Sequence, residues 1–520
     1  MDKDSGTERP QMTLKEHYHN RIPHTEGRIG SLTAEQASKL QELWRLLLAE
    51  IERNERIPVR YSLTQPAPSG ADYETTDVTA LSFEPLETLS TKDKKPDEQS
   101  GAKGTQAKAS GGSSWLFRWG GSSASTPEAA STGDEASESE SGYATPASSL
   151  PKQDDDDDDD DEDEDEDEEA KQRRHETVQA YVDRAQADNS SSGGGIIPTG
   201  FKPLFGDPLG ERTFRAAFWQ AATQLGDPDS WVLRFLRARS WDVDEALQMI
   251  SRTLVWRTGQ AIDEVAYYGE SVLHHHTMES GLAFACTRDN LDNPVYVVRV
   301  RVNFAQKRNI VAIKRFLCWQ IETSQLLGGA DGRVTILFDL SGFSRENIDL
   351  ALVRTLITLL TNYYPETLGI LILHVNSWVF SGIWSLISPF IDPAVKAKIV
   401  MARSAKDIAP FIDPSRLIAE VGGAKPFSYA YVLPSESENR CMADAEARQA
   451  TENAFVSAVG AYEAATRSWL GGVSGSDADA ARAKARDRLS QTAADLDPFI
   501  RSRTLYHRLG FINADHSVTF

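Results

Sequence analysis

The chain has 520 residues and a formal net charge of −22, from 55 lysines and arginines against 77 aspartates and glutamates. Residues 154–169 are an unbroken run of sixteen acidic residues, and removing them from the total leaves a net charge of only −6. Because the chain has no basic footprint, we expect no nucleic-acid partner. Cys286, Cys318 and Cys441 lie far apart without a CxxC pair, which argues against a disulfide framework or zinc site and favours a reducing compartment.

Residues 1–61 are interpreted as a polar leader followed by one docking helix. The first residues lack the apolar core of a signal peptide. Thr33 and Gln36 have the spacing of a capping box, and apolar residues at helical spacing continue to about Arg53. We expect this helix to dock on the main body, and a membrane-surface or partner-binding helix is the alternative.

Residues 62–195 are rich in Ser, Gly, Thr, Pro, Asp and Glu and poor in large aliphatic side chains. Such a segment cannot bury enough apolar surface to fold, so it is predicted to be a disordered acidic linker. Its acidic run is more typical of a solvated spacer than of a binding element. The aromatic island Trp115-Leu-Phe-Arg-Trp is either a short docking motif or a chance cluster.

A small helical subdomain is predicted over residues 196–270. Apolar residues recur at three- and four-residue spacing on both sides of a Gly-Asp-Pro-Asp turn. A further helix begins at a capping box formed by Asp242 and Glu245. Ahead of that box stand three arginines at spacings that by default give a solvated helix face, namely Arg234, Arg237 and Arg239.

Residues 271–423 are predicted to form an α/β domain. Two apolar runs within 281–302 are separated by turn residues, which predicts a hairpin. Further along, apolar runs over 334–338 and 370–375 flank a helical pattern. Strand, helix and strand form a βαβ unit with a right-handed crossover, so we expect a mixed, partly parallel sheet flanked by helices.

The segment after the second of these strands is apolar on almost every side of a helix. Its core stripe has i, i+3, i+4 and i+7 spacing, and it is either ordinary core or a cover over an apolar interior. The longer stretch 367–391 is interrupted by polar residues and proline, so a strand followed by a helix is favoured over a membrane span of about 20 apolar residues. The stripe consists of Phe380, Ile383, Trp384 and Ile387, widened by Val379, Leu386 and Phe390.

Catalytic signatures are missing from the sequence. It has no GxSxG nucleophile elbow, no HExxH motif and no Walker A loop. Glu322 and Glu366 are isolated carboxylates, and the three histidines at 274–276 cannot all face one metal from a regular element. We therefore expect a protein that is not an enzyme and holds neither metal nor cofactor.

Five motifs in a fixed order give the chain a family resemblance. It resembles the CRAL-TRIO lipid-binding domain, and in particular the fungal phosphatidylinositol transfer proteins, over residues 206–423. The resemblance implies a CRAL-TRIO fold of class α/β. The motifs are Leu233-Arg-Phe-Leu-Arg-Ala-Arg, Phe338-Asp-Leu-Ser-Gly, Tyr363-Tyr-Pro-Glu, Ser388-Pro-Phe-Ile-Asp-Pro and Glu420-Val-Gly-Gly.

The resemblance also implies which residues bind a lipid. It places Arg239, Glu366 and Lys398 around the inositol phosphate. The fourth head-group position is Ser240, where the family pattern has a lysine, so one positive charge is missing. Phosphatidylinositol could then bind more weakly, or the pocket could prefer phosphatidylcholine or a sterol precursor. The mobile gate over the acyl chains would comprise Phe380, Ile383, Trp384, Ile387 and Phe390.

Residues 424–520 lie beyond the resemblance and are predicted to be a helical extension packed on the body. Helical patterns cover 443–470 and, more briefly, 480–490. Glycines at 471 and 472 stop the first pattern.

These features together predict a monomeric protein that binds a phospholipid in a gated hydrophobic pocket. The expected ligand is phosphatidylinositol or phosphatidylcholine, and phosphatidylinositol is favoured. It would transfer or present that lipid between membranes. The alternatives are a lipid-sensing adaptor whose linker recruits a partner, and a carrier of a neutral lipid such as a sterol precursor. We expect it in the cytoplasm, peripheral on endomembranes and in transient contact with the membrane surface.

Overall fold

A computed structural model describes residues 27–59, 201–303, 310–328, 332–375, 384, 393–435, 437–471 and 476–520 of the chain. The predicted linker, with its acidic run and aromatic island, lies outside these residues. So does most of the predicted gate, of which Trp384 alone is described.

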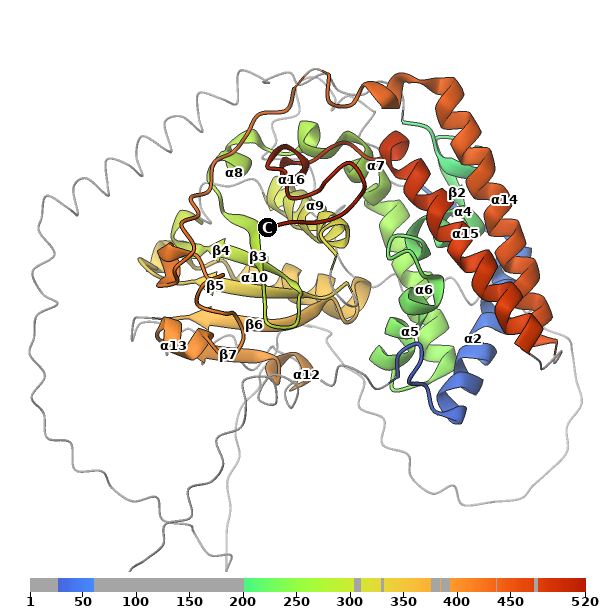
Figure 1. The fold of residues 1–520 in the computed structure, drawn as a ribbon, viewed down its shortest axis with the longest axis horizontal. Helices are drawn as coiled ribbons and strands as arrows, with labels where there is room; N and C mark the ends of the chain where they lie inside the picture. Colours follow the sequence, from blue (N-terminus) through green and yellow to red (C-terminus); the bar gives the residue numbers. More distant parts are fainter. Residues whose placement is uncertain are drawn as a thin grey trace, which may run out of the picture. The chain divides into compact units, whose positions relative to one another are not determined.

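A mixed sheet of five strands confirms the predicted fold class (Figure 1). β3 (Ala283–Arg288) and β4 (Pro294–Arg299) form the expected antiparallel hairpin. β4, β5 (Val334–Asp339), β6 (Leu368–His374) and β7 (Ile399–Ala402) pair in parallel and in that order. The central strands carry apolar residues on both faces, which is typical of parallel strands with neighbours on each side of the sheet. The short edge strand β7 was not predicted.

One face of this sheet is completely covered. α13 (Ala405–Ile408) and the loop that follows it pack on side chains from β3 to β7. Fully burying a large aliphatic side chain stabilises the fold by about 1.5–3 kcal/mol, so this cluster is a major part of the core. Its members include Val295, Val297, Leu337, Ile370, Ile372, Val400, Phe411 and Ile412.

Two helices pack against the opposite face. They are α9 (Ile310–Leu326) and α10 (Leu350–Thr358), and α10 continues into the π-helical turn η8 (Leu359–Tyr363). The Asp349 side chain caps α10 by accepting a bond from the backbone N–H of Leu352 at 2.8 Å. The short α12 (Pro393–Lys396) leads into β7.

A helical bundle precedes the sheet in the sequence. It contains α4 (Phe214–Ala222), α5 (Pro228–Ala238), α6 (Val243–Gly259) and the N-terminal helix α2 (Ala34–Arg53). The capping box of Thr33 and Gln36 is present, and α2 packs its apolar face on α4, α5 and α6. In the structure the N-terminal helix therefore packs on the bundle.

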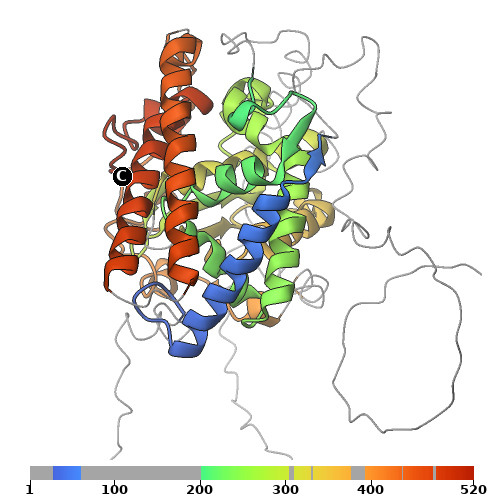
Figure 2. The same ribbon diagram turned by 90° about the vertical axis from the view of Figure 1, so that its right-hand side faces the viewer.

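The C-terminal extension joins the same core. Figures 1 and 2 show α14 (Ala445–Leu470) and α15 (Ser476–Ile500) side by side, with α2 next to α14. The second helix extends beyond the predicted 480–490 at both ends, and it includes Pro498 near its C-terminal end. Packing on α14 and the bundle buries Leu489 and Leu496, and this tertiary contact overrides weak local spacing.

Smaller elements complete the fold. β1 (Arg56–Pro58) and β2 (Glu211–Thr213) form a two-stranded antiparallel sheet. The remaining elements are η3 (Leu204–Gly206), α7 (Ile262–Tyr268), η4 (Gly269–Val272), α8 (His275–Glu279), η5 (Val300–Val302), η7 (Arg345–Asn347), η10 (Ala419–Val421), η11 (Arg440–Ala443) and α16 (Leu505–Arg508). Within the described ranges, no helix has the length and apolarity needed to cross a membrane.

Candidate functional site

Two of the predicted head-group residues lie at one edge of the sheet. Lys398 directly precedes β7, and Glu366 stands two residues before β6. Arg333, which the sequence analysis did not assign, directly precedes β5. Since β5, β6 and β7 are parallel neighbours, these positions share the edge formed by the amino-terminal ends of the strands.

Glu366 is an ionised carboxylate among arginines. Its Oε2 lies 2.6 Å from Nε of Arg237 and 3.9 Å from Nη2 of Arg333. Burial alone would raise the pKa of Glu366, but the charges of Arg237 and Arg333 outweigh burial and hold that pKa below its usual range. The residue follows the π-helical turn η8 and has φ of 57°, a conformation uncommon for a long side chain and frequent at functional sites.

Lys398 is a half-buried ammonium near the same carboxylate. Its Nζ donates a hydrogen bond to the backbone carbonyl of Leu368 at 2.9 Å. Burial, reinforced by the charges of Arg333 and Arg234 and opposed by Glu366, lowers the pKa of Lys398 to about 8. A desolvated cation of this kind gains more from an anionic ligand than an exposed lysine does.

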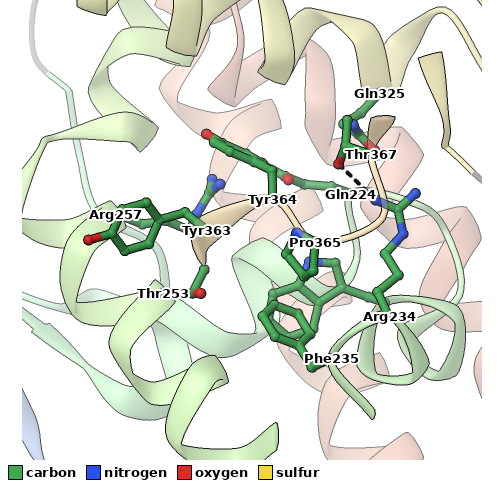
Figure 3. Close-up of a pocket in the computed structure, with 11 residues that line it drawn as sticks. Gln224, Arg234, Phe235, Thr253, Arg257, Gln325, Tyr363, Tyr364, Pro365 and Thr367 are labelled. Atoms are coloured by element: carbon green, nitrogen blue, oxygen red, sulfur yellow. Dashed lines mark hydrogen bonds between the residues drawn. The ribbon is translucent and has the colours of Figure 1, made fainter. Parts of the chain in front are cut away.

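Arg234 is buried beside this cluster. Only 5% of Arg234 is exposed, and its Nη1 donates to Oγ1 of Thr367 at 3.2 Å, as Figure 3 shows. The interpretation of these arginines as a solvated helix face is therefore wrong for Arg234. Burial, reinforced by Arg237, lowers the pKa of Arg234 to about 9.

The leader contributes a further cation. Arg28 lies in the turn before α2, and burial lowers its pKa to about 9. The positive charges of Arg333, Arg237 and Arg234 act in the same direction, and Glu366 opposes them. The leader therefore affects the electrostatics of this sheet edge, although the two lie far apart in the sequence.

Arg239 and Ser240 stand at the C-terminal end of α5. Arg239 caps the helix, and Ser240 follows it in an exposed turn with φ of 51°. On this helix the ion pair with Glu366 comes from Arg237, two residues before Arg239. The head-group role of Arg239 and Ser240 stays a prediction.

A small polar cavity adjoins the buried arginines (Figure 3). Its volume is about 20 Å³, room for one water and far too small for an acyl chain. Nearby, Glu322 is 1% exposed and accepts bonds from Arg257, Gln224 and Tyr364. Glu322 therefore joins α6, α9 and the segment before Glu366. The cavity is lined by Gln224, Trp231, Arg234, Phe235, Thr253, Arg257, Gln325, Tyr363, Tyr364, Pro365 and Thr367.

The sheet face that carries α9 and α10 is apolar and only partly covered. Met401 on β7 is 44% exposed and Leu350 on α10 is 39% exposed. Phe338 and Leu371 are half-buried, in contrast to the closed opposite face. The half-buried and exposed residues of two cross-strand rows form this surface, which we call the open apolar face: Leu371 and Ile399 in one row, and Val298, Phe338 and Met401 in the other.

The predicted gate follows β6, whose residues contribute to the open apolar face. Of its five residues, Trp384 is described, in helical conformation and half-buried. Phe380, Ile383, Ile387 and Phe390 lie outside the described residues, and their role stays a prediction.

The carboxyl-terminal edge of the sheet carries a second polar cluster. Asp339, at the end of β5, pairs with Arg301 and lies 3.5 Å from Nδ1 of His374, at the end of β6. Burial would raise the pKa of Asp339, but its contacts with His374 and Ser341 and the charge of Arg301 lower that pKa to about 2. A permanently ionised aspartate here ties the ends of neighbouring strands together.

Two models of known protein domains match this chain. The CRAL/TRIO domain model matches residues 278–423, and the model of the CRAL/TRIO N-terminal domain matches residues 175–252. The solved structure of Sfh5 is 18% identical, covers 35% of this chain and 69% of its own, and has a TM-score of 0.31.

Two curated fungal proteins are similar over most of their length. A CRAL-TRIO domain-containing protein of Schizosaccharomyces pombe is 31% identical over 322 residues, which is 60% of this chain and 71% of the relative. The phosphatidylinositol transfer protein CSR1 of Eremothecium gossypii is 32% identical over 302 residues, 56% of this chain and 69% of the relative. With the sheet, the bundle and these matches in agreement, the chain belongs to the CRAL/TRIO domain family.

Proposed function

We propose that this protein binds a phospholipid, with phosphatidylinositol favoured, and carries it between membranes. The observation that carries the proposal is the position of Glu366 and Lys398, which share one edge of a sheet whose open apolar face lies beside it. The relative CSR1, which is named as a phosphatidylinositol transfer protein, supports the same ligand class.

The two parts of the site suit the two parts of a phospholipid. β6 has seven residues and is therefore about 20 Å long, so the charged edge and the far end of the apolar face are separated by roughly an acyl-chain length. Exposing an 18-carbon chain to water costs about 14 kcal/mol, which an apolar wall offsets without any bond being broken. The phosphate needs cationic donors, which the edge supplies. No catalytic step is required.

The charge of the edge favours an anionic lipid over a neutral one. In the part of the chain that the structure describes, Arg234, Arg237, Arg333 and Lys398 all interact electrostatically with Glu366. A phosphate would accept charge-assisted hydrogen bonds from these cations, which a sterol precursor cannot do. The neutral-lipid carrier is therefore the weaker alternative.

Mass spectrometry of lipid that co-purifies with the full chain tests the proposal. We expect phosphatidylinositol to be enriched over its share of the host's lipids, and to move between vesicles when purified protein is added. An adaptor would retain its lipid and give no transfer. A chemically altered lipid released on turnover would point to an enzyme.

We further infer that the protein is a cytoplasmic monomer that meets membranes only peripherally. Alkaline carbonate should then release it from a membrane pellet. Retention in the pellet would contradict this placement.

A further inference from the structure

One guanidinium joins the leader to the edge of the sheet. Arg237 on α5 donates from Nε to Oε2 of Glu366 at 2.6 Å and from Nη1 to the backbone carbonyl of Gly27 at 2.8 Å. The side chain of Arg237 is largely buried, so both hydrogen bonds are shielded from water. A single planar group therefore connects residues 27–32, which we call the leader turn, to the carboxylate of Glu366.

The fit of the leader turn against α5 depends on a glycine. Gly27 has φ of 71°, and a Cβ added to it would lie 2.7 Å from Cζ2 of Trp241 and 3.3 Å from Cδ of Arg237. Trp241 is itself folded back, with φ of 67° and its backbone N–H bonded to the carbonyl of Leu236 at 2.7 Å. A side chain at position 27 would therefore move the Gly27 carbonyl away from Arg237.

Glu366 needs a neighbour that holds it in place. Its φ of 57° is disfavoured for a long side chain, and such a conformation persists only where the surrounding structure fixes it. Contacts from Arg237 and Arg333 both reach Oε2, and Oε1 accepts no hydrogen bond from any residue that the structure describes. Arg237 therefore fixes the carboxylate through one oxygen and leaves the other for a ligand.

The chemistry of Glu366 indicates which part of a ligand depends on this contact. An ionised carboxylate accepts hydrogen bonds and donates none, so it would bind a head-group hydroxyl and not a phosphate. Inositol has hydroxyl donors, whereas choline has none. A binding group must be held within about 0.5 Å of its productive position by supporting hydrogen bonds, and Arg237 supplies one of these to Glu366.

We propose that Arg237 is a positioning residue for head-group recognition, and that docking of the leader turn through Gly27 determines how well Glu366 binds a hydroxylated head group. The inference rests on the proposed function, because it assumes a lipid head group at Glu366. Docking of the leader turn and binding of the ligand then favour each other, and thermodynamic linkage requires the same factor in both directions.

Gly27→Ala in the full chain is the central variant, and Gly30→Ala is its matched control. The two glycines have φ of 71° and 86°, so alanine strains the backbone at either position. A Cβ on Gly30 meets no described atom within 4 Å, so only Gly27→Ala should displace the leader turn. Arg237→Lys is the second variant, because lysine keeps the charge but lacks the rigid fork that holds two acceptors.

The ligands are vesicles of phosphatidylinositol or phosphatidylcholine, and soluble glycerophosphoinositol. Gly27→Ala should lower the affinity for phosphatidylinositol by about 10- to 150-fold, the range for one charged hydrogen bond. Binding of phosphatidylcholine should be unchanged, and Gly30→Ala should behave like the unmodified protein. Arg237→Lys should cause a similar loss, and the double variant should lose no more than either single variant, because both changes break the same connection.

Hydrogen exchange of the unmodified protein is a measurement that needs no variant. Phosphatidylinositol should slow exchange in the leader turn, where the Ser31 N–H bonds to the Arg28 carbonyl at 2.9 Å. The factor should match the affinity lost in Gly27→Ala, and phosphatidylcholine should give no such protection. A glycine with a purely structural role would not produce protection that depends on the head group.

The arms separate this inference from the proposed function. If exchange shows an undocked leader turn in Gly27→Ala and phosphatidylinositol still binds as before, the inference is overturned while the carrier function stands. An equal loss for phosphatidylinositol and phosphatidylcholine would show that the leader turn is structural and would also overturn it. If the unmodified protein binds neither lipid, the carrier function fails and glycerophosphoinositol decides the inference. Binding that Gly27→Ala weakens would support it, and binding that is absent or unaffected would overturn it.

Discussion

Asp229 on α5 and Arg482 on α15 form a buried bidentate ion pair, with Nη1–Oδ2 and Nη2–Oδ1 distances of 2.5 and 2.6 Å. The indole of Trp44 on α2 donates to the same carboxylate at 2.6 Å, and the hydroxyl of Tyr462 on α14 donates at 3.3 Å. One carboxylate therefore links the N-terminal helix, the bundle and both C-terminal helices. The extension is part of the core that supports α5 and its arginines.

Asp229→Asn should destabilise the protein by about 3–5 kcal/mol, because the buried Arg482 would lose its counter-charge. Chemical denaturation of the full chain measures this. Asp487→Asn is the matched control, since Asp487 is an exposed residue of α15 that contacts Arg486, and it should cost less than about 0.5 kcal/mol. Similar small losses for both variants would contradict the linking role of Asp229.

Replacing residues 62–195 with a flexible linker of about 20 residues should leave a folded, lipid-loaded protein. Composition predicts that the segment has no core of its own, and β1 and β2 on either side of it are already paired. A Gly/Ser linker of that length has a typical span of about 25 Å. Thermal unfolding should stay as cooperative as in the full chain. A broadened transition would show that the segment is structural.

Trp384→Asp should reduce the loading of every lipid, because it places a charge on the predicted gate. Leu433→Asp is the control, as Leu433 is 62% exposed and lies outside the gate. Lipid bound per mole of purified protein should fall several-fold in the first variant and be unchanged in the second. A loss restricted to phosphatidylinositol would instead place Trp384 near the head group.

Much of the fold could be predicted from local patterns. The capping box at Thr33 and the apolar runs of β5 and β6 are local signals, and each matches the structure. The strand β7 was not predicted, because its four residues are too few to show a strand pattern. The second half of α15 was not predicted, because its helical conformation depends on packing against α14.

The candidate site was predictable only in part. Glu366 and Lys398 came from the family pattern, and the structure brings both to one sheet edge. The position of Arg333 could have been predicted from the sequence, because residues that directly precede neighbouring parallel strands lie at the same edge of the sheet. Arg28 gives no such signal in the sequence, because it lies 209 positions before Arg237 and the docked leader brings the two segments together.

Lys398→Ala should weaken phosphatidylinositol binding by about 10- to 150-fold, because it removes a charged donor from a partly dehydrated site. Binding of a sterol or a squalene-like hydrocarbon, which has no phosphate, should be spared. Lys396→Ala is the control, since Lys396 is exposed two residues earlier. An equal loss for charged and uncharged lipids would make Lys398 a structural lysine at a strand edge.

The pH dependence of binding should follow Lys398. Its pKa of about 8 in the free protein lies below the ordinary 10.5. Below pH 8 the ammonium is already protonated, and affinity for an anionic lipid should be constant. Above pH 8 binding must include protonation of Lys398, so affinity should fall by up to about 10-fold per pH unit. Lys398→Ala should remove this slope, and a neutral lipid should show none.

Stability of the ligand-free protein should change with pH in the opposite direction. The unfolded chain binds a proton at Lys398 up to about pH 10.5, whereas the folded chain releases it near pH 8. Between these values the unfolded state holds more protons, so the free energy of unfolding should rise with pH, and the cost of burying the charge is fully present below pH 8. Lys398→Met should therefore stabilise the free protein at pH 7 while weakening its ligand binding. Denaturant titrations at pH 7 and pH 9.5 measure the change of stability with pH and the effect of Lys398→Met on it. If Lys398→Met were less stable than the unmodified protein at pH 7, the ammonium of Lys398 would stabilise the fold and the prediction would be wrong.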